Sequence, residues 1–512
     1  MAHSSSGSDV RAEEAGIGRR GFVRDHGLGS AERSEAVDQV VGRVRELGLR
    51  TVRMVVVDQH GVPRTKFLSA PAAEAALVRG LNFSSAIYQL DSGNTVFTGG
   101  FVADADLDMP EMTGFPDVVA VPDPSSFRVL PWADRTGWIL CDTYFPSGLP
   151  NPLCGRGLLR RQLEVLGHEG LRYVAGLEVE FLVVRRDVQR IALDDLGHPP
   201  PVPAVSASAH GYQFLSETRL DSAHAVLDPL RDALWEVGLA PRTMEDEWGP
   251  GQFEFTFSPM EGLAAADAMV LLRSTVKQVC ARHGFVASFM SAPHLPHSFP
   301  SGWHLHCSLT THEGANVFAD EHRTPSRNGL HYIAGQLRHA AALTAFATPT
   351  ANGYGRYRPY SFAPWRIGWS VDNRGSAIRV VGGPGDTGTH VENRLGEPCA
   401  NPYLYMAADL AAGRDGMTRA VQPPPAETSD PYAGESRLLP RTLAEAVSAL
   451  EESDFYRGEF GDRFVSYYVK MRRCEIARRQ EAIRAAGAGG EGSAGGKAAA
   501  EDWEMREYFE FF

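Results

Sequence analysis

The segment that most constrains the fold is Ala175–Val184, an apolar, strand-prone run that is interrupted by Glu178 and Glu180. Residues two apart on a β-strand share a face, so both carboxylates are predicted to point to the same side. Two carboxylates about 4 Å apart repel each other by roughly 4 kcal/mol at an effective dielectric constant of about 20. We therefore expect positive charge beside them. For an isolated Glu-x-Glu, the alternative is a solvated edge strand with an acidic outer face.

Size and composition indicate a soluble globular protein. The chain has 512 residues, of which 43% are apolar and 9% aromatic, enough for a large core and at least two domains. No stretch resembles a membrane helix or a secretory signal, so we expect a cytoplasmic protein. The six cysteines have no CxxC spacing and are predicted to be mostly buried thiols. A net charge of −13 argues against a general nucleic-acid partner.

Punctuation by Pro and Gly divides the chain into three parts. We expect a disordered N-terminal tail over residues 1–30, a small domain over 31–147 and a larger domain over 148–512. Within the small domain, a helix from about Ser34 to Leu47 is predicted to lead into a buried strand at Thr51–Asp58.

The C-terminal end combines two contrasting compositions. Residues 485–500 form a Gly/Ala-rich insert that is too poor in large apolar groups to fold alone. Residues 503–512 are rich in aromatic side chains. Such a tail is expected to dock on the body of the protein or on a neighbouring subunit.

Further segments also place polar side chains on one face of a strand. In the segment 251–257, Gln252 and Glu254 share a face with Thr256, and phenylalanines fill the opposite face. In the segment 303–308, His304 and His306 point the same way. Taken alone, His304 is more often a hydrogen-bonded core histidine than a ligand. Five such segments together point instead to one shared site.

Arginines accompany these carboxylates further along the chain. Arg374 and Arg379 lie five residues apart, and Glu392 and Arg394 alternate with apolar residues. A curved sheet carrying carboxylates and an imidazole would hold Mg²⁺ or Mn²⁺, and arginines beyond them would hold anionic substrates. Phosphoryl transfer uses this combination of groups. The sequence contains no phosphate-binding Gly-x-x-x-x-Gly-Lys-Ser/Thr loop, so any nucleotide is bound in another way.

The ordered series of motifs resembles the glutamine synthetase family over nearly the whole chain. The motifs are the Glu-x-Glu strand, Pro250-Gly-Gln-Phe-Glu254, Gly302 to Ser308, Asn373 to Arg379, and Glu392 followed by Asn-Pro-Tyr-Leu404. The resemblance implies an α+β fold, with an N-terminal β-grasp-like domain and a catalytic domain built on a curved antiparallel sheet flanked by helices. It also implies a homo-oligomer, a hexameric ring or a dodecamer, with active sites between subunits.

The same resemblance implies roles for individual residues. One cation would be held by Glu180, Glu247 and Glu254, and a second by Glu178, His304 and Glu392, with Glu245 and Asp246 as alternatives to Glu247. Arg374, Arg379 and Glu247 would be catalytic, Arg356, Arg394 and Phe362 would contact the substrates, and His306, Ser308, Asn373 and Arg379 would contact ATP.

The implied reaction phosphorylates a side-chain carboxylate with ATP and lets an amine attack the acyl phosphate. Two departures alter the amine pocket: the Asn82–Ile87 stretch lacks the family's ammonium-binding aspartate, and Phe362 stands where a flap glutamate is usual. His390 replaces a usual arginine, and the Ser298–Ser301 stretch replaces the usual glutamate loop. Among the branches of the family, the pattern is closest to the γ-glutamylpolyamine and γ-glutamylamide synthetases.

The preferred hypothesis is a ligase that forms a γ-glutamyl amide from glutamate and an organic amine, such as a polyamine, ethanolamine or another monoamine. The alternatives are a ligase for a different amino dicarboxylic acid, a glutamine synthetase using ammonium, and a non-catalytic scaffold or sensor. A metal-dependent hydrolase would suit the carboxylates alone, but the arginines argue against it.

Overall fold

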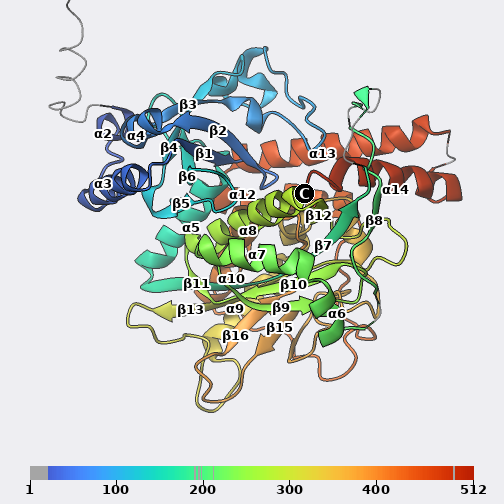
Figure 1. Ribbon diagram of the computed structural model, residues 1–512. Coiled ribbons are helices and arrows are strands. Elements are labelled where there is room, and N and C mark those ends of the chain that lie inside the picture. Colours follow the sequence, from blue (N-terminus) through green and yellow to red (C-terminus); the bar gives the residue numbers. More distant parts are fainter. Residues whose placement is uncertain (1–20, 189–191, 194–195, 198, 212, 488–489) are drawn as a thin grey trace, which may run out of the picture. The chain divides into compact units, whose positions relative to one another are not determined.

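The computed structural model describes residues 21–188, 192–193, 196–197, 199–211, 213–487 and 490–512 (Figure 1). They form two compact units, of which the smaller comprises residues up to 56, 64–85 and 116–151, and the larger comprises 57–63, 86–115 and 152–512. The domain boundary expected near residue 147 stays a prediction. Residues 1–20 of the expected tail lie outside the described residues, whereas residues 22–25 form a short helix.

The smaller unit contains one sheet and its covering helices. Its elements are α2 (Phe22–Asp25), α3 (Ala31–Glu46), β1 (Thr51–Val57), β2 (Pro63–Ser69), α4 (Ala70–Arg79), β3 (Leu81–Ser84), β4 (Asp117–Pro122), η4 (Pro124–Ser126), β5 (Arg128–Val129) and β6 (Thr136–Tyr144). The strand order is β2-β1-β6-β4-β3, and β5 pairs with β6. The predicted helix and the predicted strand that follows it are confirmed by α3 and β1.

Local sequence explains these two elements. The side chain of Ser30 accepts a hydrogen bond from the Arg33 amide at 3.1 Å and so caps the start of α3. Val37, Val40 and Val44 recur at helical spacing and are buried. Strand β1 is rich in β-branched residues, which fit a pleated, buried surface.

The larger unit carries the rest of the secondary structure. Its elements are η1 (Ser85–Tyr88), η2 (Ala103–Asp106), η3 (Pro110–Met112), α5 (Gly155–His168), β7 (Leu171–Arg186), β8 (Val205–Ala207), α6 (Glu217–Ser222), α7 (His224–Glu236), β9 (Pro241–Asp246), β10 (Gln252–Phe257), β11 (Met260–Glu261), α8 (Leu263–Arg282), β12 (Phe285–Ser288), β13 (Trp303–Thr311), α9 (Arg327–Ala347), η6 (Asn352–Arg356), β14 (Trp369–Val371), β15 (Ile378–Val381), β16 (His390–Asn393), α10 (Pro402–Thr418), α11 (Leu443–Glu451), α12 (Asp454–Phe460), α13 (Asp462–Ala485) and α14 (Ala494–Tyr508).

One large sheet organises this unit, with strand order β14-β15-β16-β13-β7-β10-β9 and with β8, β11 and β12 also pairing with β7. All the strand pairs in this sheet are antiparallel except β14 with β15, which is parallel. The expected antiparallel sheet is therefore present, with one parallel pair at its edge.

One face of the sheet is apolar and packs against helices. Leu177, Val179 and Phe181 of β7 are at most 1% exposed, and the Phe181 ring packs against Phe255 and Phe289 with centroid distances of 5.0 and 5.3 Å. Within the larger unit, helices α5 and α8 contact β7, and α10 packs against α5, α8 and α9. The alternating residues of β7 must then face the other side.

The C-terminal aromatic tail docks on the larger unit, as one of the two expected outcomes. Trp503, Tyr508, Phe509 and Phe512 are buried. Helix α14 begins at Ala494, inside the segment expected to be unable to fold alone, and the Ser493 side chain caps it through the Gly496 amide at 3.0 Å. The segment is helical because its downstream aromatic residues anchor it by packing.

All six cysteines are free thiols, and five of them are buried, which confirms the expectation. None of the helices in the described part of the chain combines the length and the apolar character that a membrane crossing needs.

A buried ionic cluster fixes helix α13 within the larger unit. The Glu475 carboxylate accepts hydrogen bonds from Arg472 at 2.7 Å, from the Ser92 amide at 3.0 Å and lies 2.8 Å from Nε2 of His60. Glu475, Arg472 and His60 are each 1% exposed. Burial raises the pKa of Glu475, but the Arg472 guanidinium and the His60 ring outweigh it and hold this pKa well below its usual value.

We predict that Glu475→Ala destabilises the protein by about 3–5 kcal/mol at neutral pH, because it leaves Arg472 buried without its partner. The pKa of Glu475 is lower in the folded protein than in the unfolded chain, where it is 4.5. The contribution of Glu475 to the free energy of unfolding is therefore present above pH 4.5 and is lost as the pH falls below that value. Urea unfolding at several pH values measures this. Glu481→Ala, at an exposed position of the same helix, is the control; equal stability of the two variants would contradict the prediction.

Candidate active site

The strand registers bring the predicted site residues into three rows on one face of the large sheet. The first row runs from Glu245 through Glu254 to Glu180. The second runs from Thr256 through Glu178 to His304, and the third from His306 through Glu392 to Arg379. Residues directly opposite each other on neighbouring strands share a face. The expectation that Glu178 and Glu180 point to the same face of the sheet is confirmed.

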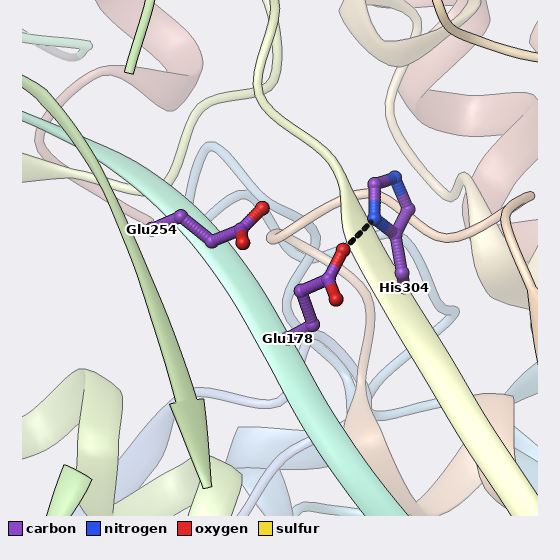
Figure 2. A group of neighbouring side chains, drawn as sticks. All are labelled: Glu178, Glu254 and His304. Atoms are coloured by element: carbon purple, nitrogen blue, oxygen red, sulfur yellow. Dashed lines mark hydrogen bonds and ion pairs between the residues drawn. The ribbon is translucent and has the colours of Figure 1, made fainter. Parts of the chain in front are cut away.

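Glu178 lies between two histidines of β13. Nδ1 of His304 is 2.5 Å from one oxygen of Glu178, and Nε2 of His306 is 3.1 Å from the other. Figure 2 shows the His304 contact and the carboxylate of Glu254, which extends toward Glu178 from the neighbouring strand. Burial raises the pKa of Glu178, but these two hydrogen bonds outweigh it and hold the pKa well below its usual value.

Glu392 is engaged by two arginines. Nη1 of Arg379 donates to one oxygen at 2.9 Å, and Arg394 donates to the other. The Glu392 side chain is fully buried. Burial alone raises its pKa, but Arg394 and the nearby histidines lower it to about 2. Glu392 is therefore a charged carboxylate at neutral pH.

Glu180, at the end of the first row, is held by two hydrogen bonds. Its carboxylate accepts hydrogen bonds from Nε2 of Gln252 and from the Gly302 amide, both at 3.1 Å. A Cβ atom at position 302 would lie 2.7 Å from Nη1 of Arg356 and 3.0 Å from Nε2 of His304. Glycine at position 302 thus lets Arg356 and His304 approach the strand beside Glu180.

The structure separates the three acidic residues 245–247. Asp246 is buried, forms an ion pair with Arg219 at 2.9 Å and lies opposite Phe253, on the apolar face. Glu245 and Glu247 line the cavity with the other acids, and the Trp248 amide donates to Glu247 at 3.3 Å. Asp246 therefore does not line the cavity, and the choice of ligand among residues 245–247 stays a prediction.

Three site carboxylates hold protons more tightly than usual. Burial, reinforced by neighbouring carboxylates, raises the pKa of Glu247 to about 7, of Glu180 to about 8 and of Glu254 to about 10. Crowded carboxylates with raised pKa values are typical of sites that bind cations or transfer protons.

Among the residues that the structure describes, two groups of side chains have the spacing of a metal site. Glu178, Glu254 and His304 have ligand atoms within 4.8 Å of one another, and so do Glu178, His306 and Glu392. Glu178 belongs to both groups. Carboxylate oxygens with one imidazole are a donor set that fits Mg²⁺ or Mn²⁺.

Glu178, Glu254, His304 and His306 line an open cavity of about 1290 Å³ in the larger unit, whereas the predicted ligand Glu392 is fully buried behind Arg379 and Arg394 and does not line it. The cavity brings together the predicted residues Glu178, Glu180, Glu247, Glu254, His304, His306, Ser308, Arg356, Phe362, Arg374, Arg379 and Arg394, and also His390. Asn373 does not line it; its side chain hydrogen-bonds the Gly375 amide and the Ser429 carbonyl.

The arginine side chains are positioned by the surrounding loops. Arg356 donates to the Leu395 carbonyl at 2.7 Å, and Arg394 donates to the Phe362 carbonyl at 3.2 Å. Phe362 has a φ of 59° and is 63% exposed toward the cavity it lines. His390, which stands where an arginine was expected, lies 3.0 Å from Nδ1 of His306.

Sequence reasoning assigned no site role to several contributors. Asp372 pairs with Arg379 at 2.6 Å, and Gln252 links Glu180 to the Ser301 hydroxyl. The position of Gln252 on the acidic face of its strand was a usable signal. Phe214, Trp248 and Phe299 also line the cavity, and they come from separate segments without a shared motif.

Acids with the spacing of a cation site lie beside several arginines, an arrangement that fits an enzyme for anionic substrates. The family model for "Glutamine synthetase, catalytic domain" matches residues 152–487. A γ-glutamylanilide synthase from Acinetobacter sp. is 39% identical, over 95% of this chain and 98% of the relative. A glutamate–isopropylamine ligase from Pseudomonas sp. is 30% identical, over 87% and 96%. A solved complex of GmaS with ADP is 28% identical with a TM-score of 0.72, over 86% and 96%.

This chain belongs to the glutamine synthetase family. As a ligase of that family, it forms carbon–nitrogen bonds. Its N-terminal sheet and its large, mostly antiparallel sheet agree with the fold that the sequence motifs implied.

We predict that cation binding releases protons, because Glu247, Glu180 and Glu254 retain protons above their usual pKa of 4.5. Because the pKa values are raised from 4.5, folded protein without cations loses stability as the pH rises from about 4.5 through the folded values of about 7, 8 and 10. Mn²⁺ should therefore raise the melting temperature more at about pH 8 than at about pH 6.

Calorimetry in two buffers of different ionisation enthalpy counts the released protons. Glu254→Gln should release about one proton fewer, whereas Glu261→Gln, at an exposed position, should behave as the wild type. Mn²⁺ affinity that does not change with pH would contradict this.

Proposed function

We propose that this ligase joins glutamate to an organic primary amine, with ATP as the phosphoryl donor, and forms a γ-glutamyl amide. The observation that carries the proposal is a set of acids, histidines and arginines in one cavity, which Phe362 also lines where a flap glutamate is usual. A γ-glutamylanilide synthase and a glutamate–isopropylamine ligase among the relatives, and a neighbour solved with ADP, support it.

Within this proposal, two cations would be held on the sheet face. Glu180, Glu247 and Glu254 would hold one, and Glu178, His304 and Glu392 the other. The side-chain spacing groups Glu178 instead with Glu254 and His304, and with His306 and Glu392, so His306, 3.1 Å from Glu178, is a further candidate ligand. Mg²⁺ or Mn²⁺ supplies neutralisation of the phosphate charge and orientation of the phosphates.

The arginines would hold the anionic parts of the substrates. Arg356 adjoins Glu180 and would bind the carboxylate of the amino acid together with Arg394. Arg374, which is exposed in the cavity, and Arg379 would meet the transferred phosphoryl group. His306 and Ser308 would face the nucleotide. Asn373 does not line the cavity, and its side chain accepts a hydrogen bond from the Gly375 amide in the turn that precedes β15.

In the reaction, a side-chain carboxylate oxygen of the acid attacks the γ-phosphorus of ATP, and ADP leaves. The amine nitrogen then attacks the carbonyl carbon, the bond from that carbon to the phosphate oxygen breaks, and phosphate departs. The amine loses a proton to phosphate or water. Arginine side chains positioned beside the developing charge stabilise both steps.

The identity of the acid substrate is a separate question from the identity of the amine. The loop Ser298–Ser301, which adjoins the cavity through Phe299 and Pro300, differs from the family's usual glutamate loop, and this favours a test of other amino dicarboxylic acids. A cytoplasmic location and a ring-shaped homo-oligomer are part of the same proposal.

We predict that, with ATP and Mg²⁺, amide forms faster with organic amines than with ammonium, because Phe362 offers an apolar wall where an acid would attract a small cation. Phosphate release and amide mass are measured over glutamate, aspartate and 2-aminoadipate and over a panel of amines. Equal or better turnover with ammonium would refute the proposed function. ATP-independent release of products from amides would point to a hydrolase.

We also predict that Glu180→Gln lowers turnover by at least about 100-fold, since even partners of metal ligands cost roughly 10- to 100-fold when replaced. The carboxyl group lies between Gln252, Gly302 and the neighbouring acids, so the amide keeps the shape and removes the negative charge that Glu180 would gain when a cation displaces its proton. Glu261→Gln is the matched surface control. Full activity of Glu180→Gln would remove Glu180 from the cation site.

A further inference from the structure

Three exposed aromatic side chains stand together at the cavity. The rings of Phe214 and Trp248 are stacked, with centroids 5.4 Å apart and an interplanar angle of 5°. The ring of Phe299 lies 6.3 Å from Trp248. All three line the cavity, and they are 44%, 40% and 42% exposed. We call Phe214, Trp248 and Phe299 the aromatic platform.

The platform is held in place from the apolar side of the sheet. The Leu215 amide donates to the Asp246 carbonyl at 3.0 Å, and Arg219 forms its ion pair with the Asp246 carboxylate. Leu215 has a φ of 56°, a strained conformation for a leucine that these two contacts maintain. Asp246 thus anchors the loop that carries Phe214 against the end of β9, next to Trp248.

Direct contacts join the platform to the site carboxylates. The amide of Trp248 donates to Glu247 at 3.3 Å. Nε2 of Gln252 donates both to Glu180 at 3.1 Å and to the carbonyl of Pro300 at 3.2 Å, the residue after Phe299. The aromatic platform therefore lies beside Glu180 and Glu247, close to Arg356. In the proposed function, the amine attacks the activated acid at this part of the cavity.

The charges of the cavity disfavour a polyamine. Among the described lining residues, the carboxylates are Glu178, Glu180, Glu245, Glu247 and Glu254. All but Glu245 belong to the proposed cation set, so one acid remains for the additional ammonium groups of a polyamine. Flat apolar surface, in contrast, is abundant there, and exposed apolar patches of this kind mark binding sites.

We propose that the aromatic platform binds the ring of an aromatic primary amine, so that arylamines such as aniline are the preferred nucleophiles. Aromatic rings stack on each other favourably beyond the effect of area alone. An arylamine is uncharged at neutral pH and attacks without prior loss of a proton, which fits a pocket with Phe362 in the place of a flap acid. This proposal rests on the proposed function and names its substrate class.

The bond changes are those of the ligase step. The lone pair of the arylamine nitrogen forms the C–N bond with the activated carboxyl carbon, and the bond to the phosphate oxygen breaks. Phosphate leaves with the electron pair, and the nitrogen releases one proton to phosphate or water. No further reactant is needed.

The test compares aniline with cyclohexylamine, ethylamine, spermidine and ammonium at saturating ATP and glutamate. We expect kcat/KM to be highest for aniline. Trp248→Ala and Phe214→Ala should each raise KM for aniline about tenfold, a larger change than in KM for glutamate or for ethylamine. Trp248→Phe should restore most of the aniline affinity.

The control is Trp235→Ala, which removes an equally large exposed indole from α7, outside the cavity lining. It should leave the preference for aniline unchanged. Melting curves identify any variant that does not fold, in which case Trp248→Leu and Phe214→Leu carry the comparison.

The outcomes separate the two proposals. If small amines give amide and aniline is not preferred, the platform does not select arylamines, and the proposed function stands. The same holds if Trp248→Ala keeps the preference for aniline. Absence of amide from every amine would overturn the proposed function itself.

Discussion

The site depends on the pairing of β7 with β10 on one side and β13 on the other. This register sets Glu178 opposite both Thr256 and His304, and Glu180 opposite Glu254. A shift of one residue in either pairing would turn the acids into the apolar core and expose phenylalanines. The register is fixed by the opposite face, where Val179 and Phe181 are fully buried against Phe255 and its neighbours. Apolar packing thus determines where the charged groups lie.

That register creates an electrostatic gradient across the sheet. Beside β13 and β16, arginines and histidines keep Glu178 and Glu392 charged, and the pKa values of these two acids are lowered despite burial. At the β9 end, Glu180, Glu247 and Glu254 have few compensating cations and raised pKa values. The second group therefore gains most from an added divalent cation, since binding it offsets both burial and mutual repulsion.

The sequence predicted the rows because strand alternation and motif order are local properties. Glu178, Glu254 and His304 could be placed on one face without knowledge of the fold. The assignment among residues 245–247 stayed open, because nothing local shows that Asp246 lies opposite Phe253 and meets Arg219. Helix α14 was not expected, because its stability comes from buried aromatic residues rather than from the propensity of its first turns. Phe214, Trp248 and Phe299 converge only through tertiary structure.

The turn between β9 and β10 combines two tasks that are chemically separate. Glu247 faces the acids, and the next residue, Trp248, contributes a backbone amide to Glu247 and a side chain to the aromatic platform. The hydrogen bond that supports Glu247 does not depend on which side chain stands at position 248. Phe214 and Phe299 likewise donate no side-chain hydrogen bond to a site carboxylate, because a phenyl ring has no donor. Substitutions at these three positions therefore alter the surface offered to the amine while the strand registers that position the acids stay unchanged.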